Sequence, residues 1–231
     1  MAIHYFKKAE KNASTGYDQT QETVSRMLAE IEAEGESKAK EYCFSLDGWA
    51  GDVVVGREQI EAAKAKVPEQ LKQDIQFAYE RVSRFAAAQR DSICEFETEL
   101  SPGLFAGQKL IPMETAGCYV PGGRYAHIAS AIMSVATAKV AGVRNVVACS
   151  VPRDEHGIHP AILYAMDLAG ADTILQMGGV QGIASMAFGL FTGKPADILV
   201  GPGNRFVAEA KRQLFGRCGI DMFAGPTEIG I

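Results

Sequence analysis

Apolar residues recur at helical spacing through the first part of the chain. Val24, Leu28 and Ile31 stand three or four residues apart with acidic residues around them, as on an amphipathic helix. Pro68 marks the start of a further helix, whose apolar face comprises Leu71, Ile75, Ala78, Val82 and Phe85. The pattern predicts a helical region over residues 1–100. Its last helix is expected to exceed about 25 residues and to cover either its own core or a neighbouring subunit.

The pattern then changes to short apolar runs between glycines and prolines. Ser101–Gly117 predicts a β hairpin or linker over residues 101–116. Three further apolar runs predict strands: "NVVACSV", "DTILQM" and "DILVG". They alternate with helix-compatible segments at residues 130–141, 160–169, 182–190 and 205–215. Such alternation is typical of parallel βαβ units. We therefore predict an α/β fold, with a Rossmann-like domain over residues 117–218 and a further segment over residues 219–231.

Three glycine turns follow predicted strands: "GCYVPGG" at Gly117–Gly123, "QMGGVQG" at Gln176–Gly182 and "VGPGN" at Val200–Asn204. The carboxyl ends of parallel strands share one edge, where helix N-termini favour an anion such as pyrophosphate. Asn204 suits the N-cap of the next helix. A formal dinucleotide fingerprint is missing, because Phe206 stands where GxGxxG needs its third glycine. The turns predict a nucleotide-like ligand, with ordinary αβ turns as the open alternative.

Composition narrows the class of protein. The chain has 231 residues, 47% of them hydrophobic, and a formal net charge of -5, so we expect no nucleic-acid partner. The first residues lack the apolar core of a signal peptide, and no run of about 18 apolar residues follows, so we expect a cytoplasmic protein that does not enter a membrane. The five cysteines are odd in number and form no CxxC motif, which favours reduced thiols.

Five ordered motifs carry a resemblance to a known family: "YVPGG", "AKVAGV", "GGVQGIASMAFG", "GPGNRFVAEAKRQLFG" and "GIDMFAGPTE". Together they resemble the histidinol dehydrogenase family. The resemblance implies two Rossmann-like domains, with this chain reaching the start of the second, a homodimer, a catalytic zinc, and two NAD-dependent oxidations of a primary alcohol through an aldehyde to a carboxylate. It makes Tyr119, Gln181 and Asn204 the expected NAD contacts. For Gln181 and Asn204, purely structural polar caps remain the alternative.

The resemblance also implies what this chain lacks. In the family, the zinc ligands and the glutamate–histidine pair follow the "GPTE" motif, so we expect them beyond Ile231. We therefore expect no catalytic or metal-binding residue in this chain. The chain resembles an N-terminal half, which we expect to be inactive alone. His156 and His159 lie in a loop-like "HGIH", where we do not expect zinc. Cys118 and Cys149 fall in predicted strands, and we expect buried thiols there rather than nucleophiles.

Two departures from the family pattern concern the substrate. Thr227 replaces the serine of the usual "GPSE", and the "RYAHIAS" segment brings Arg124 and His127 beside the first glycine turn. A histidine or cation there could receive a sulfonate, as in a branch of the family that oxidises 2,3-dihydroxypropane-1-sulfonate to sulfolactate. A packed helix-start residue is an equal reading of His127, and a surface arginine is the favoured reading of Arg124. L-Histidinol as substrate, or a non-catalytic nucleotide-binding or assembly module, remain alternatives.

Overall fold

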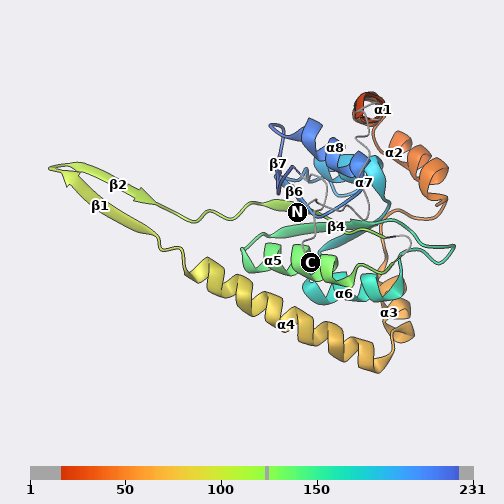
Figure 1. Ribbon diagram of the computed structural model, residues 1–231, viewed down its shortest axis with the longest axis horizontal. Helices are drawn as coiled ribbons and strands as arrows, with labels where there is room; N and C mark the ends of the chain where they lie inside the picture. The colour runs from red at the N-terminus through yellow and green to blue at the C-terminus, as the bar shows by residue number, and fades with distance from the viewer. Residues whose placement is uncertain (1–16, 123–124, 224–231) are drawn as a thin grey trace, which may run out of the picture.

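The computed structural model describes residues 17–122 and 125–223 (Figure 1). Its helical elements are α1 (Tyr17–Glu34), α2 (Glu36–Tyr42), the π-helical turn η1 (Cys43–Asp47), α3 (Arg57–Lys66), α4 (Glu69–Asp91), α5 (Ile128–Val140), α6 (Pro160–Ala169), α7 (Gly179–Phe188) and α8 (Arg205–Leu214). Its strands are β1 (Phe96–Ser101), β2 (Leu104–Gln108), β3 (Thr115–Tyr119), β4 (Asn145–Ser150), β5 (Thr173–Gln176), β6 (Ile198–Val200) and β7 (Gly219–Ile220). The predicted α/β fold is confirmed.

A parallel five-stranded sheet forms the centre of the molecule. Its strand order is β5-β4-β3-β6-β7, and Cys118 of β3 pairs with Ala148 on one side and Val200 on the other. Every residue of β3 and β4 is buried, which explains why these strands read as continuous apolar runs. The order reverses beside β3, since β4 and β5 follow on one side and β6 and β7 on the other.

Helices cover both faces of this sheet. Helices α5 and α6 lie on one face, and α7 and α8 on the other (Figure 1). The helices of the N-terminal region form an outer layer on each side: α1 and α2 pack over α7 and α8, whereas α3 and α4 pack over α5 and α6. Each face therefore has its own cluster of buried apolar side chains, to which the N-terminal helices contribute.

The segment that joins the two pairs of N-terminal helices runs along the edge of the sheet. The Val55 amide donates to the Ile174 carbonyl at 2.9 Å, and the Gln176 amide donates to the Val53 carbonyl at 2.7 Å. Val54 forms an antiparallel bridge with Leu175 of β5. These bonds occupy polar groups of β5 at the sheet edge and fix the N-terminal region to the sheet.

Helix α4 confirms the start that the sequence predicted and corrects the predicted length. It begins directly after Pro68 and packs along α5, so it covers a core of its own chain, and packing against a neighbouring subunit stays a prediction. With 23 residues, it is shorter than expected. Phe85, which the sequence places on the apolar face of this helix, is 67% exposed in this chain, whereas Ala86 is buried. Three helical turns after Ile75 bring residue 86, not residue 85, back to the buried side.

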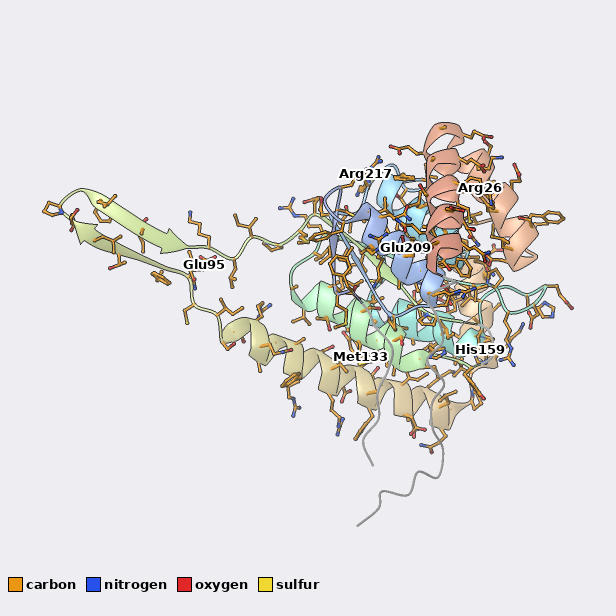
Figure 2. The ribbon with its side chains drawn as sticks, turned by 45° about the horizontal axis from the view of Figure 1, so that its top comes forward. Arg26, Glu95, Met133, His159, Glu209 and Arg217 are labelled. Atoms are coloured by element: carbon orange, nitrogen blue, oxygen red, sulfur yellow. The ribbon has the colours of Figure 1, made fainter. Side chains whose placement is uncertain are left out.

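The hairpin begins earlier than the sequence suggested. Strands β1 and β2 are antiparallel, with Phe96 opposite Gln108, so residues 96–100 are extended rather than helical. Its signal is the period of two in "FETEL", where the strand-forming Phe96, Thr98 and Leu100 alternate with two glutamates. All residues of both strands are exposed, and the hairpin projects from the body (Figure 1). Glu95 lies where it departs (Figure 2).

At the other edge of the sheet, β7 pairs with β6, with Gly219 opposite Ile198. Residues 219 and 220 therefore extend this sheet, although the sequence suggested a new segment from residue 219. Residues 224–231, which follow, are not among the described residues. Of the helices in the described parts of the chain, none combines the length and apolar character needed to cross a membrane.

Candidate cofactor site at the carboxyl edge of the sheet

The three glycine turns lie at one edge of the sheet, as predicted. They follow β3, β5 and β6, whose carboxyl ends point the same way because the strands are parallel. After β3 the chain enters α5 on one face, and after β6 it enters α8 on the other, so a crevice forms between these strands. A cavity of about 770 Å³ lies here, lined by residues of all three turns. Open α/β sheets bind their ligands at such reversals of strand order.

A larger cavity of about 910 Å³ lies between α4, α5 and the linker after the hairpin. Its lining is mostly apolar and includes Ile111, Val143 and Met133, which Figure 2 labels on α5. Small-molecule sites usually combine apolar walls with a few convergent polar groups. The cavity at the glycine turns has that combination, so we take it as the candidate site.

Tyr119 lines the candidate site from the end of β3. It is the last residue of β3, and its buried hydroxyl accepts a hydrogen bond from the Gly179 amide at 3.2 Å. Burial raises the pKa of the Tyr119 phenol above its ordinary value, so the group stays neutral at physiological pH. The ring thus joins the end of β3 to the start of α7.

Gln181 lies in the first turn of α7 and is only 1% exposed. Its Nε2 donates to Asp47 Oδ2 at 2.9 Å, whereas its Oε1 has no hydrogen-bond partner among the described residues. Gly179 makes room for this amide: its φ is +52°, and a Cβ there would lie 3.0 Å from Gln181 Oε1. An orphaned buried acceptor beside a cavity is the kind of atom that a bound ligand satisfies.

Asp47 is the residue of the site that sequence reasoning missed. It is the last residue of η1, and its Oδ2 also accepts a hydrogen bond from the Gly178 amide at 2.8 Å. It thereby binds the amide of Gly178, the N-cap residue of α7, although the two residues lie 131 positions apart. The local sequence offers only an Asp-Gly pair, which indicates a turn. Only the packing of α2 and η1 against α7 shows the role of Asp47.

Asn204 confirms its predicted place as the N-cap of α8. Its Oδ1 accepts hydrogen bonds from the Phe206 amide at 2.9 Å and the Val207 amide at 3.1 Å. The cap uses the side-chain oxygen, so the Nδ2 amide is what Asn204 can offer to a ligand. This residue therefore presents a donor to the cavity, whereas Gln181 presents an acceptor.

Gly201 precedes this helix in a tightly held turn. Its φ is +115°, and a Cβ there would lie 2.0 Å from the Tyr119 carbonyl oxygen. Its amide donates to Asp221 Oδ2 at 2.8 Å, and its carbonyl accepts from Lys211 Nζ at 2.8 Å. Lys211 and Asp221 also pair with each other at 2.5 Å. The ion pair fixes both polar groups of the glycine that separates β6 from α8.

His127 lines the same cavity as Tyr119, Gln181 and Asn204. It stands immediately before α5, and its carbonyl accepts a hydrogen bond from the Ser130 amide, but its side chain does not cap the helix. The imidazole is exposed. The structure thus brings together four of the residues that the sequence singled out. Thr227 and Arg124 lie outside the described residues.

The structure gives Cys118, Cys149 and His159 packing or capping roles rather than catalytic ones. Cys118 and Cys149 are buried, and burial raises the pKa of Cys118 to about 12 and that of Cys149 well above its ordinary value. Both thiols are thus poor nucleophiles. His159 Nδ1 accepts a hydrogen bond from the Ala161 amide and caps α6; Figure 2 labels this residue. Among the described residues, no three His, Cys, Asp or Glu side chains cluster closely enough to hold a metal ion.

The family model described as "Histidinol dehydrogenase" matches residues 10–231. A protein of Ruegeria pomeroyi named "Histidinol dehydrogenase homolog" is 62% identical over 207 residues, which are 90% of this chain and 48% of the relative. A second protein of the same organism, named "Sulfopropanediol 3-dehydrogenase", is 57% identical over 228 residues, which are 99% of this chain and 52% of the relative. The chain therefore spans about half the length of the curated relatives it matches.

A solved structure shows the same arrangement. The crystal structure of histidinol dehydrogenase from Elizabethkingia anophelis matches with a TM-score of 0.84 and 32% sequence identity, over 96% of this chain and 50% of the other. Histidinol dehydrogenase of Methanococcus maripaludis is 40% identical over 208 residues, which are 90% of this chain and 49% of the relative.

Proposed function

Because this chain belongs to the histidinol dehydrogenase family, we propose that it carries the NAD-binding part of a dehydrogenase that converts a primary alcohol through an aldehyde to a carboxylate. One observation supports this above all: Tyr119, Gln181 and Asn204, the expected NAD contacts, line one cavity at the reversal of strand order. NAD is the hydride acceptor in this chemistry. The chain's own residues bind and orient it.

The chemistry of the cavity supports a dinucleotide. The orphaned Gln181 Oε1 needs a hydrogen-bond donor, which a ribose hydroxyl or a carboxamide supplies. Arg26 of α1, labelled in Figure 2, also lines the cavity and brings a positive charge that suits a pyrophosphate. Tyr119, although buried, also lines the cavity and adds an apolar contact for the ligand.

We expect a zinc ion in the whole enzyme only because the chain resembles a family of zinc enzymes. The described residues lack a suitable cluster of ligands, so we propose no metal-dependent step for them. The resemblance assigns the zinc ligands and the acid–base pair to residues after the "GPTE" motif. The proposed share of this chain in the reaction is to bind NAD and to form one wall of the substrate site. A homodimer in the cytoplasm remains our expectation for the whole enzyme.

For the substrate we propose 2,3-dihydroxypropane-1-sulfonate, with sulfolactate as product. The 57% identity to the sulfopropanediol 3-dehydrogenase supports this choice. His127 lines the candidate cavity and supplies a possible donor to a sulfonate. L-Histidinol is the second candidate, since relatives named histidinol dehydrogenase match as well, at 40% identity or below.

Calorimetric titration of the natural full-length protein with NAD⁺ tests the cofactor assignment. We expect Gln181→Ala and Asn204→Ala each to weaken NAD⁺ binding about fivefold to tenfold, since each loses a hydrogen bond to the cofactor. Zinc content should stay unchanged. Gln213→Ala is the matched control, because this glutamine contacts the Gln21 carbonyl on α1 rather than the cavity. Undiminished NAD⁺ binding in both site variants would contradict the assignment, and a parent protein without affinity for NAD⁺ would favour a non-catalytic module.

Steady-state kinetics tests the substrate. We expect kcat/KM of the full-length enzyme to be far higher for 2,3-dihydroxypropane-1-sulfonate than for L-histidinol. His127→Ala should lower kcat/KM chiefly for the sulfonate, by about tenfold, because a charged acceptor loses its donor. His156→Ala is the control, since His156 is exposed and lies in another loop. Efficient turnover of L-histidinol without activity on the sulfonate would contradict the proposed substrate and favour L-histidinol instead.

A further inference from the structure

Two glycine amides at the N-terminus of α7 are not free to bind a phosphate. Helix N-termini at the carboxyl edge of a Rossmann-like sheet commonly bind phosphates through free amides. Here the Gly178 amide already donates to Asp47 Oδ2 at 2.8 Å, and the Gly179 amide donates to the Tyr119 hydroxyl at 3.2 Å. A phosphate that bound these two amides would have to displace both groups and would face the negative charge of Asp47.

The same carboxylate determines which way the Gln181 amide faces. A carboxylate can only accept hydrogen bonds, so the Nε2 group must be the part of the amide that faces Asp47, at 2.9 Å. The Oε1 atom then points away from Asp47. It has no partner among the described residues, although the side chain is 1% exposed and lines the cavity. The α7 end of the cavity thus presents an acceptor whose orientation depends on Asp47.

We propose that Asp47 is a positioning residue that makes the α7 end of the cavity a site for a neutral, hydroxyl-bearing group, a ribose of the dinucleotide, and keeps phosphates away from it. This inference rests on the proposed NAD-binding function. Ribose hydroxyls donate hydrogen bonds, and Gln181 Oε1 is the acceptor held ready for one of them. The pyrophosphate is then bound nearer to Arg26 and Asn204, whose side chains carry N–H donors.

Calorimetric titration of the natural full-length protein with NAD⁺ tests the coupling between the two residues. We expect Asp47→Ala and Gln181→Ala each to weaken NAD⁺ binding about tenfold, which corresponds to about 1.4 kcal/mol. The double variant should bind no more weakly than Gln181→Ala alone, because Asp47 acts through Gln181. Additive losses in the double variant, or an Asp47→Ala protein that binds like the parent, overturn the inference.

A rescue experiment separates positioning from a general structural role. Gln181→Glu cannot donate to Asp47, so the two carboxylates repel and NAD⁺ binding should fall at least tenfold. In Asp47→Asn/Gln181→Glu the new amide donates to the new carboxylate, which again leaves an oxygen for the ribose. We expect this pair to bind NAD⁺ within about threefold of the parent. Failure of the rescue overturns the inference even if Asp47→Ala does not fold.

A matched control and a second ligand complete the test. Glu36 of α2 accepts a hydrogen bond from the Phe191 amide at 2.9 Å and thus also joins the N-terminal helices to the region of α7, but it does not line the cavity. Glu36→Ala should leave NAD⁺ binding unchanged. Asp47→Ala should bind inorganic pyrophosphate more tightly than the parent, because the Gly178 amide becomes free; weaker binding contradicts the inference. A parent that does not bind NAD⁺ overturns the proposed function and, with it, this inference.

Discussion

Helices α7 and α8 both begin at the candidate site, but different parts of the chain hold their first turns. The start of α8 depends on nearby residues: Asn204 caps it, and Lys211 and Asp221 bind the preceding glycine. The start of α7 depends on Asp47 and Tyr119, which lie 131 and 60 residues away. The first turn of α8 is therefore held mainly by residues near it in the sequence, whereas that of α7 is held by residues of η1 and β3.

Because the two helix starts are held differently, they present different hydrogen-bonding groups to the cavity. The α8 side uses its cap oxygen for the helix and keeps an amide N–H group for a ligand, whereas the α7 side keeps an oxygen. One end of the cavity thus offers donors and the other an acceptor, which suits a ligand with phosphates at one part and hydroxyls at another. Four substitutions, from the largest expected effect to the smallest, test how independent the two sides are.

Gly201→Ala should have the largest effect, because it disturbs the local turn of α8 most directly. An alanine there must adopt a φ near +115° and place its Cβ 2.0 Å from the Tyr119 carbonyl oxygen. We expect the free energy of unfolding to fall by about 4 kcal/mol, measured by urea denaturation. Gly193→Ala is the control, since Gly193 also has a positive φ but no atom within 4 Å of its Cβ position. Equal losses in both variants would mean that strain, rather than the contact with β3, dominates.

Lys211→Met should come next. The Lys211 side chain is 3% exposed, and its ammonium group binds both the Gly201 carbonyl and Asp221. Methionine keeps the apolar stem but removes the donor, so the Gly201 carbonyl loses the Lys211 hydrogen bond and Asp221 keeps only those from the Gly201 and Met222 amides. Because Asp221 is partly exposed, we expect a loss of about 2 kcal/mol rather than the full cost of a broken buried pair. Thermal denaturation followed by circular dichroism measures it, and an unchanged melting temperature would show that the ion pair does not hold the turn.

Asn204→Ala removes the local cap alone. The Phe206 and Val207 amides lose their acceptor, so we expect the free energy of unfolding to fall by about 1 kcal/mol. Asn204→Asp keeps the oxygen in place and should restore the stability in the same denaturation assay. If the aspartate variant is as unstable as the alanine variant, the cap is not what fixes the start of α8.

Asp47→Asn should have the smallest effect on stability, because the carboxamide oxygen can accept the hydrogen bonds that the Gly178 amide and Gln181 Nε2 now donate to the carboxylate. We expect a change below about 0.5 kcal/mol in the free energy of unfolding. Hydrogen exchange at the first turn of α7 should stay slow. Fast exchange there would show that the remote acceptor needs its charge, in contrast to the neutral local cap of α8.

The sequence predicted well those features that depend on neighbours in the chain. Pro68 marks the start of α4, Asn204 caps α8, and the strands around Cys118 and Cys149 are buried, each as the local pattern indicated. The hairpin was placed too late, because its first strand follows a long helical pattern without a glycine or proline between them. The strand was marked only by alternation over a few residues, which is a weak signal beside such a helix.

The sequence by itself determined the parallel sheet, the three glycine turns at its carboxyl edge and the family motifs that identify Tyr119, Gln181 and Asn204. Their signals lie in residue spacing and in the conformations that glycine, proline and asparagine allow. Only the tertiary structure decided that α1 to α4 divide between the two faces and that Asp47 binds the Gly178 amide and orients Gln181. A hydrogen bond between residues more than a hundred positions apart depends on how helices pack, and no local pattern encodes that geometry.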